Sequence, residues 1–172
     1  MSARPVPRPV PRPILRWPDP RLRRRAATVE AVTDATRALW DEMIAVMEAM
    51  PGVGLAAPQL GVMERLAVVD ASEARGQAIR MANPEILDAS REMAERSEAS
   101  PCLPGVSAVV RRPARVTVRY LNEAGVIDRR ELEGLWAVSV QHQIDHLEGR
   151  MFFDRLSRVK RDMILRRAKK AG

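Results

Sequence analysis

Cysteine, histidine and aromatic residues are scarce in this chain of 172 residues. Its one cysteine, Cys102, excludes an internal disulfide and is typical of a protein in a reducing compartment. Its only histidines are His142 and His146, so any imidazole chemistry must use this pair. No apolar run approaches the length of a membrane span or a signal-peptide core. We therefore expect a cytoplasmic protein with no membrane partner, and the length suits a single core.

Positive charge is concentrated at the two ends of the chain. Residues 1–25 contain eight arginines and one aspartate, and residues 155–172 contain eight Lys or Arg and one aspartate. Each end therefore carries +7, which leaves −7 for the middle of a chain whose net charge is +7. Two basic ends on an acidic body are typical of a protein that binds a polyanion, although solvated tails have the same composition.

The two basic ends differ in the backbone that they favour. Residues 3–13 read ARPVPRPVPRP, in which proline excludes helix and favours polyproline II. We expect residues 1–13 to form a disordered extension and residues 14–172 to form one domain. In residues 157–170, Val159, Met163, Ile164 and Ala168 recur near helical spacing among basic residues, which predicts an amphipathic C-terminal helix.

The pattern between the ends predicts an α+β fold. Apolar residues at helical spacing indicate helices over residues 34–50, with Asp34 as a cap, and over residues 135–148, buried in part by Leu135. Short runs rich in β-branched residues predict strands, and a turn at residues 122–125 joins the last two. The predicted strands cover residues 66–70, 80–83, 109–112, 115–121 and 126–133.

The second predicted helix carries both histidines in the sequence QHQIDHLEG, residues 141–149. His142 and His146 are four residues apart, so they project from one helical face and can chelate one divalent metal. In an HExxH site, a glutamate after the first histidine is the general base. Here that position holds Gln143, whose amide can orient a water molecule but cannot take its proton.

Three segments resemble the peptide deformylase family. They are ILRWPDPRLR (residues 14–23), PGVGLAAPQ (residues 51–59) and QHQIDHLEG, in the family's order and at about its separations. The resemblance implies antiparallel sheets around a central helix that carries HxxxH, together with a C-terminal helix. It also implies action on the formylated N-terminus of nascent peptides. In bacterial members the C-terminal helix is associated with ribosome docking, so the ribosome or its RNA is a second implied partner.

The same resemblance implies a site. Its metal would be Fe²⁺, often replaced by Zn²⁺, Ni²⁺ or Co²⁺, with His142 and His146 as ligands. Gln59 matches the glutamine that assists the oxyanion. The small residues before it, including Gly52 and Gly54, suit close approach of a ligand or of another backbone, and Gly54 is counted with Gln59 and Gln143 among the catalytic positions.

The third family ligand is a cysteine in the segment EGCLS, and this chain departs from the family there. Residues 98–107 read EASPCLPGVS. Without gaps, Ser100 occupies the cysteine position, and Pro101, which has no N–H, occupies that of the leucine whose N–H faces the oxyanion. A slip of two residues would instead make Cys102 the ligand and Leu103 the oxyanion donor. A metal held through Ser100 would be weakly bound or absent.

These departures favour a deformylase-like protein, a pseudoenzyme in the extreme, that keeps a peptide- or metal-binding cleft while its activity is lost or strongly reduced. One alternative is an active metal-dependent deformylase that removes formyl from the N-terminal formylmethionine of nascent proteins. Another is a protein that binds the ribosome or RNA through its basic ends. Of these three hypotheses, only the active deformylase makes the chain a fully functional enzyme.

Overall fold

A computed structural model describes residues 12–172 of the chain. Its helices are α1 (Asp34–Ala49), α2 (Gly134–Leu147) and α3 (Arg158–Ala171), with short 3-10 helices at Pro20–Arg23, Ala57–Leu60 and Phe152–Arg155. Its strands are β1 (Gly54–Ala56), β2 (Leu66–Val69), β3 (Ile79–Ala89), β4 (Met93–Ser100), β5 (Leu103–Pro113), β6 (Arg115–Leu121) and β7 (Ile127–Glu133). Within residues 12–172, no helix combines the length and the apolar character needed to cross a membrane.

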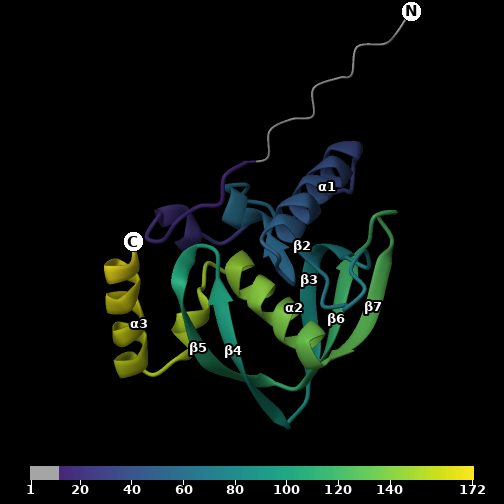
Figure 1. Ribbon diagram of the computed structural model, residues 1–172. Coiled ribbons are helices and arrows are strands. Elements are labelled where there is room, and N and C mark those ends of the chain that lie inside the picture. The colour runs from purple at the N-terminus through teal and green to yellow at the C-terminus, as the bar shows by residue number, and fades with distance from the viewer. Residues whose placement is uncertain (1–11) are drawn as a thin grey trace, which may run out of the picture.

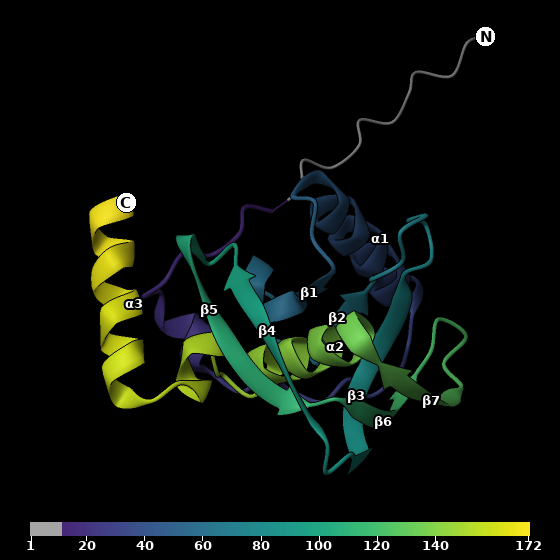
Figure 2. The ribbon, with the colours of Figure 1, turned by 60° about the horizontal axis from the view of Figure 1, so that its bottom comes forward.

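The strands form two antiparallel sheets. Five of them make a sheet in the order β1-β2-β3-β6-β7, and β4 and β5 pair as a separate hairpin. Helix α2 lies in the middle of the molecule, between this hairpin and the larger sheet, and α3 lies along the outer side of β5 (Figures 1 and 2). The α+β class with antiparallel sheets, predicted from the sequence, is confirmed.

Helix α1 covers one end of the larger sheet. Its N-cap is Thr33, whose side chain accepts a hydrogen bond from the backbone of Thr36, so the prediction of Asp34 as the cap was wrong by one residue. Leu39, Met43 and Met47 repeat every four residues and are buried against β1 and β2. The methionines therefore fill the core, as expected for flexible apolar side chains.

The middle of the molecule is built on the apolar face of α2. Ala137 and Val140 pack against the alternate residues of β6 that point inward, Val116, Val118 and Tyr120. Leu135 is 37% exposed, so the expectation that it helps to bury the helix was wrong. It lies in the first turn of α2, where it lines a cleft instead.

Residues from distant parts of the chain meet at the outer side of β5 (Figure 1). Leu22 of the first 3-10 helix, Phe152 and Phe153 pack with Ile164 of α3 in one apolar cluster. The extension predicted for residues 1–13 lies outside the described residues except for its last two. Of these, Arg12 donates from its backbone and its guanidinium to Glu42 of α1.

Candidate active site

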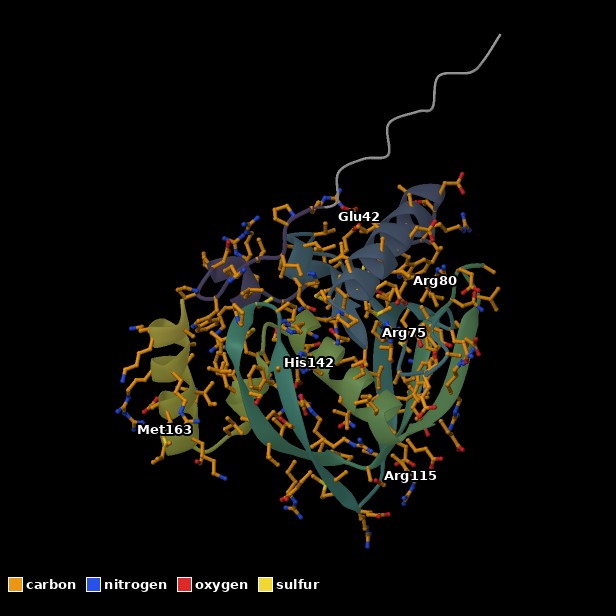
Figure 3. All side chains as sticks on the ribbon, in the orientation of Figure 1. Glu42, Arg75, Arg80, Arg115, His142 and Met163 are labelled. Carbon is orange, nitrogen blue, oxygen red and sulfur yellow. The ribbon has the colours of Figure 1, made fainter. Side chains whose placement is uncertain are left out.

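Helix α2 brings both histidines to one buried place. His142 and His146 are 8% and 2% exposed, and their ring centroids are 5.0 Å apart. His142 lies near the middle of the molecule (Figure 3). The pair expected from the i, i+4 spacing is thus formed.

The ring of His142 is fixed by its neighbours. Its Nδ1 lies 2.9 Å from Oε1 of Glu98 on β4, and the ring stacks on Phe152 at a centroid distance of 6.3 Å. Burial raises the pKa of Glu98, but hydrogen bonds from His142 and Arg112 outweigh it and hold this pKa below its ordinary value. The carboxylate is therefore ionised and accepts the Nδ1 proton, which leaves Nε2 of His142 for another partner.

Behind the histidines lies a buried network of charged side chains. Arg112 of β5, which is 2% exposed, donates to both carboxylate oxygens of Glu98 at 2.7 and 2.9 Å and to Asp145 of α2 at 2.9 Å. Arg155 also donates to Asp145, at 2.6 and 3.1 Å. Both oxygens of Asp145 are thus engaged by guanidinium groups, so this carboxylate fixes α2 against its neighbours.

His146 has no such partner. Its Nε2 is buried, and no hydrogen-bond partner for it exists among residues 12–172. Burial, followed by the charges of His142 and Arg112, lowers the pKa of His146 well below its ordinary value. The ring is therefore neutral, and a buried neutral imidazole nitrogen without a partner is suited to a metal ion or a ligand.

Gln143 presents a second unpartnered atom, Oε1, which is also buried without a hydrogen-bond partner in the described part of the chain. Its side chain lies against Gly54. A Cβ added at Gly54 would lie 2.5 Å from both Gln143 Nε2 and Ser139 Oγ. Only glycine fits at this contact, so Gly54 belongs to the site through its lack of a side chain.

His142, Gln143 and Glu98 line an open cleft of about 500 Å³, whereas His146 is not among its lining residues. Its walls are the segment between α1 and β1, the end of β4 with the turn that follows it, and the first half of α2. The site residues that line it are Gly54, Gln59, Glu98, Ser100, Pro101, Leu103, His142 and Gln143. A cleft of this size with an apolar lining and a few polar groups is typical of a ligand site.

The turn between β4 and β5 decides which residue faces the cleft. Ser100 pairs with Leu103, so Pro101 and Cys102 are the two residues of the turn, and Ser100 Oγ accepts the N–H of Cys102 at 3.3 Å. Ser100 and Pro101 line the cleft. Cys102 is 1% exposed and packs in the apolar cluster at the outer side of β5.

Gln59 lines the cleft and also contacts Cys102 of this turn. Its Oε1 accepts the N–H of Ala56, and its Nε2 donates to Cys102 Sγ at the long distance of 3.6 Å. Burial raises the pKa of the Cys102 thiol, against the hydrogen bond from Gln59. The sulfur therefore lies in the apolar cluster within reach of the Gln59 amide, and Ser100 rather than Cys102 lines the cleft.

A family model described as "Polypeptide deformylase" matches residues 11–162 of the chain. The chain belongs to this family. It is 45% identical over 165 residues to a peptide deformylase of Rhizorhabdus wittichii, covering 92% of this chain and 93% of the relative. It is 46% identical over 159 residues to a peptide deformylase of Phenylobacterium zucineum, a match that covers 91% of this chain and 94% of the relative.

Solved structures of peptide deformylases have the same fold. That of a peptide deformylase from Legionella pneumophila superposes with a TM-score of 0.88 at 39% identity, covering 94% of this chain and 95% of that one. The structure of the Ehrlichia chaffeensis peptide deformylase in complex with actinonin superposes with a TM-score of 0.86 at 35% sequence identity. The match covers 92% of this chain and 95% of that one. The relatives are consistent with activity, and they do not show the loss of activity expected from the sequence.

Deformylases are metal-dependent, and the donors in this chain fit a metal only in part. The unpartnered Nε2 of His146 and the neighbouring ring of His142 suit a divalent ion. Beside them the cleft offers the hydroxyl of Ser100, a poor ligand compared with a thiolate. Within residues 12–172, no group of three His, Cys, Asp or Glu side chains is placed to hold a metal ion.

No sequence motif singles out Arg112, the centre of the charged network. It lies on β5 in the run VVRRP, where Arg111 is exposed and Arg112 is buried. Strand alternation tells the two faces apart but does not identify the face that meets α2. The one indirect signal was Glu98, which matches the glutamate of the family segment EGCLS. If that carboxylate is buried, it requires a cation nearby, and Arg112 is that cation.

Replacing Arg112 by methionine is expected to lower the free energy of unfolding by about 3–5 kcal/mol, because two buried carboxylates would lose their cation. Urea denaturation of metal-free protein measures this loss. Arg115→Met is the matched control, since Arg115 pairs with Glu92 in solvent and its loss should change stability little. Equal losses of unfolding free energy in the two variants would show that the buried network stabilises the fold no more than an exposed ion pair does.

Proposed function

We propose that this protein is a metal-dependent peptide deformylase with a slow chemical step, which removes formyl from the N-terminal formylmethionine of nascent chains. One observation carries the proposal: His142 lines an open cleft, and next to it the buried His146 has an Nε2 without a partner in the described residues. The names of the relatives, at about this length and above 40% identity, support the same activity.

Each site residue then has a role. His142 and His146, with Ser100 as third donor, would hold the metal ion, which supplies Lewis-acid polarisation and lowers the pKa of water. Glu98 fixes the ring of His142 through Nδ1. Gln143 positions a water molecule through its free Oε1, and Gln59 provides an amide N–H on the side of the cleft where the formyl oxygen would lie.

The chemical step is slow because two catalytic groups are missing. A general base typically contributes about 10²–10⁴ in rate, and Gln143 cannot act as one. One oxyanion donor contributes about 10²–10³, and Pro101 has no N–H to donate. The two losses need not multiply, since residues that act together are not additive.

A second function is a protein that binds formylated N-termini without turnover, which is the reading that the sequence favoured first. The specific observation behind it is the coincidence of Gln143, Ser100 and Pro101 in one cleft. Both functions use the same walls and the same peptide, and they differ only in whether formate is released.

Formate release separates the two functions. The protein is prepared anaerobically, loaded separately with Fe²⁺, Ni²⁺, Co²⁺ and Zn²⁺, and incubated with a formylmethionyl tripeptide. We expect slow turnover that a chelator abolishes and that His146→Ala removes. A folded sample that holds metal and binds the peptide but releases no formate would leave the binding function.

The ribosome is the proposed cellular partner, in the cytoplasm where nascent chains emerge. Support comes from α3, whose exposed cations are Arg158, Lys160, Arg166, Arg167, Lys169 and Lys170. Binding of such a helix to ribosomal RNA weakens steeply with salt because counterions are released. Association that does not depend on salt would count against this partner.

A further inference from the structure

One wall of the cleft is an irregular segment, Pro51–Gly54, that joins α1 to β1. Its backbone groups are bound to several neighbours. The N–H of Gly52 donates to Met47 at 2.7 Å, and the carbonyl of Val53 accepts from the backbone of Asp70 and from Ser139 Oγ, both at 2.9 Å. The shape of this wall therefore depends on elements outside it.

Arg75, in the loop between β2 and β3, is one of these elements. Its Nη2 donates to the carbonyl of Gly52 at 2.6 Å, its Nη1 to the carbonyl of Asp70 at 2.8 Å, and its Nε to Glu48 of α1 at 3.1 Å. One guanidinium thus ties the last turn of α1, the cleft wall and the end of β2 together. A planar group with donors in fixed directions suits all three contacts, whereas an ammonium group can make only some of them at once.

The backbone of Arg75 is unusual, with φ of 59° in the left-handed region. Such a conformation is unfavourable for a residue other than glycine and persists where the surroundings hold it. Here the carboxylate of Asp70 holds the loop, accepting from Ser72 N at 3.0 Å, Ser72 Oγ at 2.5 Å and Gln77 N at 3.0 Å. The loop is built to present the side chain of Arg75 to the wall.

We propose that Arg75 is a positioning residue that fixes the Pro51–Gly54 wall and so sets how tightly the cleft holds a peptide. This inference rests on the proposed function for its ligand, a formylated peptide N-terminus. Arg75 does not line the cleft. Its effect is therefore expected on peptide binding and not on the chemical step.

The test compares Arg75→Met with Arg75→Lys and a matched control. In metal-loaded protein, Arg75→Met should raise the Kd for the tripeptide formyl-Met-Ala-Ser about tenfold, as expected for losing a charged hydrogen bond, and leave kcat unchanged. Arg75→Lys should recover part of the affinity. Arg80→Met is the control, because Arg80 pairs with the exposed Asp41 of α1 and does not line the cleft, and it should leave Kd unchanged.

If Arg75→Met does not fold, Arg75→Gly removes the side chain while relieving the left-handed backbone. An unchanged Kd in the folded variant, or an equal rise in the Arg80 control, overturns the proposal. A fall in kcat at unchanged Kd also overturns it, since a wall residue should not change the chemistry.

A second measurement does not depend on the activity. Amide hydrogen exchange at Gly52 and Gly54 reports local opening of the wall, and it should become about tenfold faster in Arg75→Met but not in Arg80→Met. Wild-type protein that binds no formylated peptide would refute the proposed function, and exchange would still decide the role of Arg75. Exchange that is unchanged in the variant overturns that role whether or not peptide binds.

Discussion

Replacing Ser100 by cysteine is expected to raise the affinity for Co²⁺ by about 100-fold or more, because even a lost outer hydrogen bond at a metal site costs about 10–100-fold. Ser100 lines the same cleft as His142, so the thiol would be introduced at the position that the family's cysteine ligand occupies in the ungapped alignment. A thiolate is the donor that borderline-soft metals prefer over a hydroxyl. Equilibrium dialysis measures the affinity, and a thiolate-to-cobalt charge-transfer band reports the new bond directly.

Cys102→Ala is the matched control for this experiment. Cys102 is buried in the apolar cluster on the other side of the turn, so its removal should leave Co²⁺ affinity and the spectrum unchanged. A charge-transfer band in the wild-type protein that Cys102→Ala abolishes would mean that the register of the turn differs from the one described above. A Ser100→Cys protein without the band would mean that position 100 does not reach the metal.

Replacing Gln143 by glutamate is the second large effect that we expect. In the Ser100→Cys background, Gln143→Glu should raise the rate of formate release by about 10²–10⁴, the usual contribution of a general base. The carboxylate would occupy the place of Oε1, which has no partner within the described chain. Release of formate under saturating peptide measures kcat, where the gain should appear.

Gln143→Met in the same background is the control for this second change. It keeps the length of the side chain and removes the amide, so it should release formate more slowly than the parent because no group positions the water. A gain with methionine as large as that with glutamate would attribute the effect to packing. No gain with glutamate would mean that the missing base is not what limits the rate.

Elements with strong local signals could be predicted from the sequence. The helices α1, α2 and α3 were expected within one or two residues of their observed ends, because their apolar residues recur at helical spacing. The strand expected over residues 115–121 is observed as β6, in which the alternating residues Val116, Val118 and Tyr120 are buried. Thr117, which lies between them, is also only 8% exposed, because β6 is a central strand with a neighbour on each side.

Strand β4 was missed for a physical reason. It reads MAERSEAS, and most of its residues are exposed, so it has no apolar pattern to find. Its strand conformation comes from its pairing with β5, which no local propensity encodes. The same holds for Arg112 and Asp145, which come from distant parts of the chain and meet only when α2 packs on the hairpin.

The choice between Ser100 and Cys102 also could not be made from the sequence. Both alignments to the family pattern gave plausible neighbours, and residues i and i+2 of a strand share a face. In the structure, Pro101 and Cys102 form a two-residue turn, and the Cys102 side chain packs in the cluster with Leu22 and Phe152. This placement depends on contacts between distant parts of the chain, which the motif alone does not encode. We therefore propose Ser100 as the residue that faces the metal, and the Co²⁺ experiments above test that choice.

Formate release by the wild-type protein and by Cys102→Ala, both loaded with Co²⁺ under anaerobic conditions, tests the central claim most directly. The claim is that the family's cleft acts on formylated peptides without the family's thiolate. It predicts slow, chelator-sensitive turnover that is the same in both proteins. Turnover that disappears with Cys102→Ala, in a variant that remains folded, would contradict it.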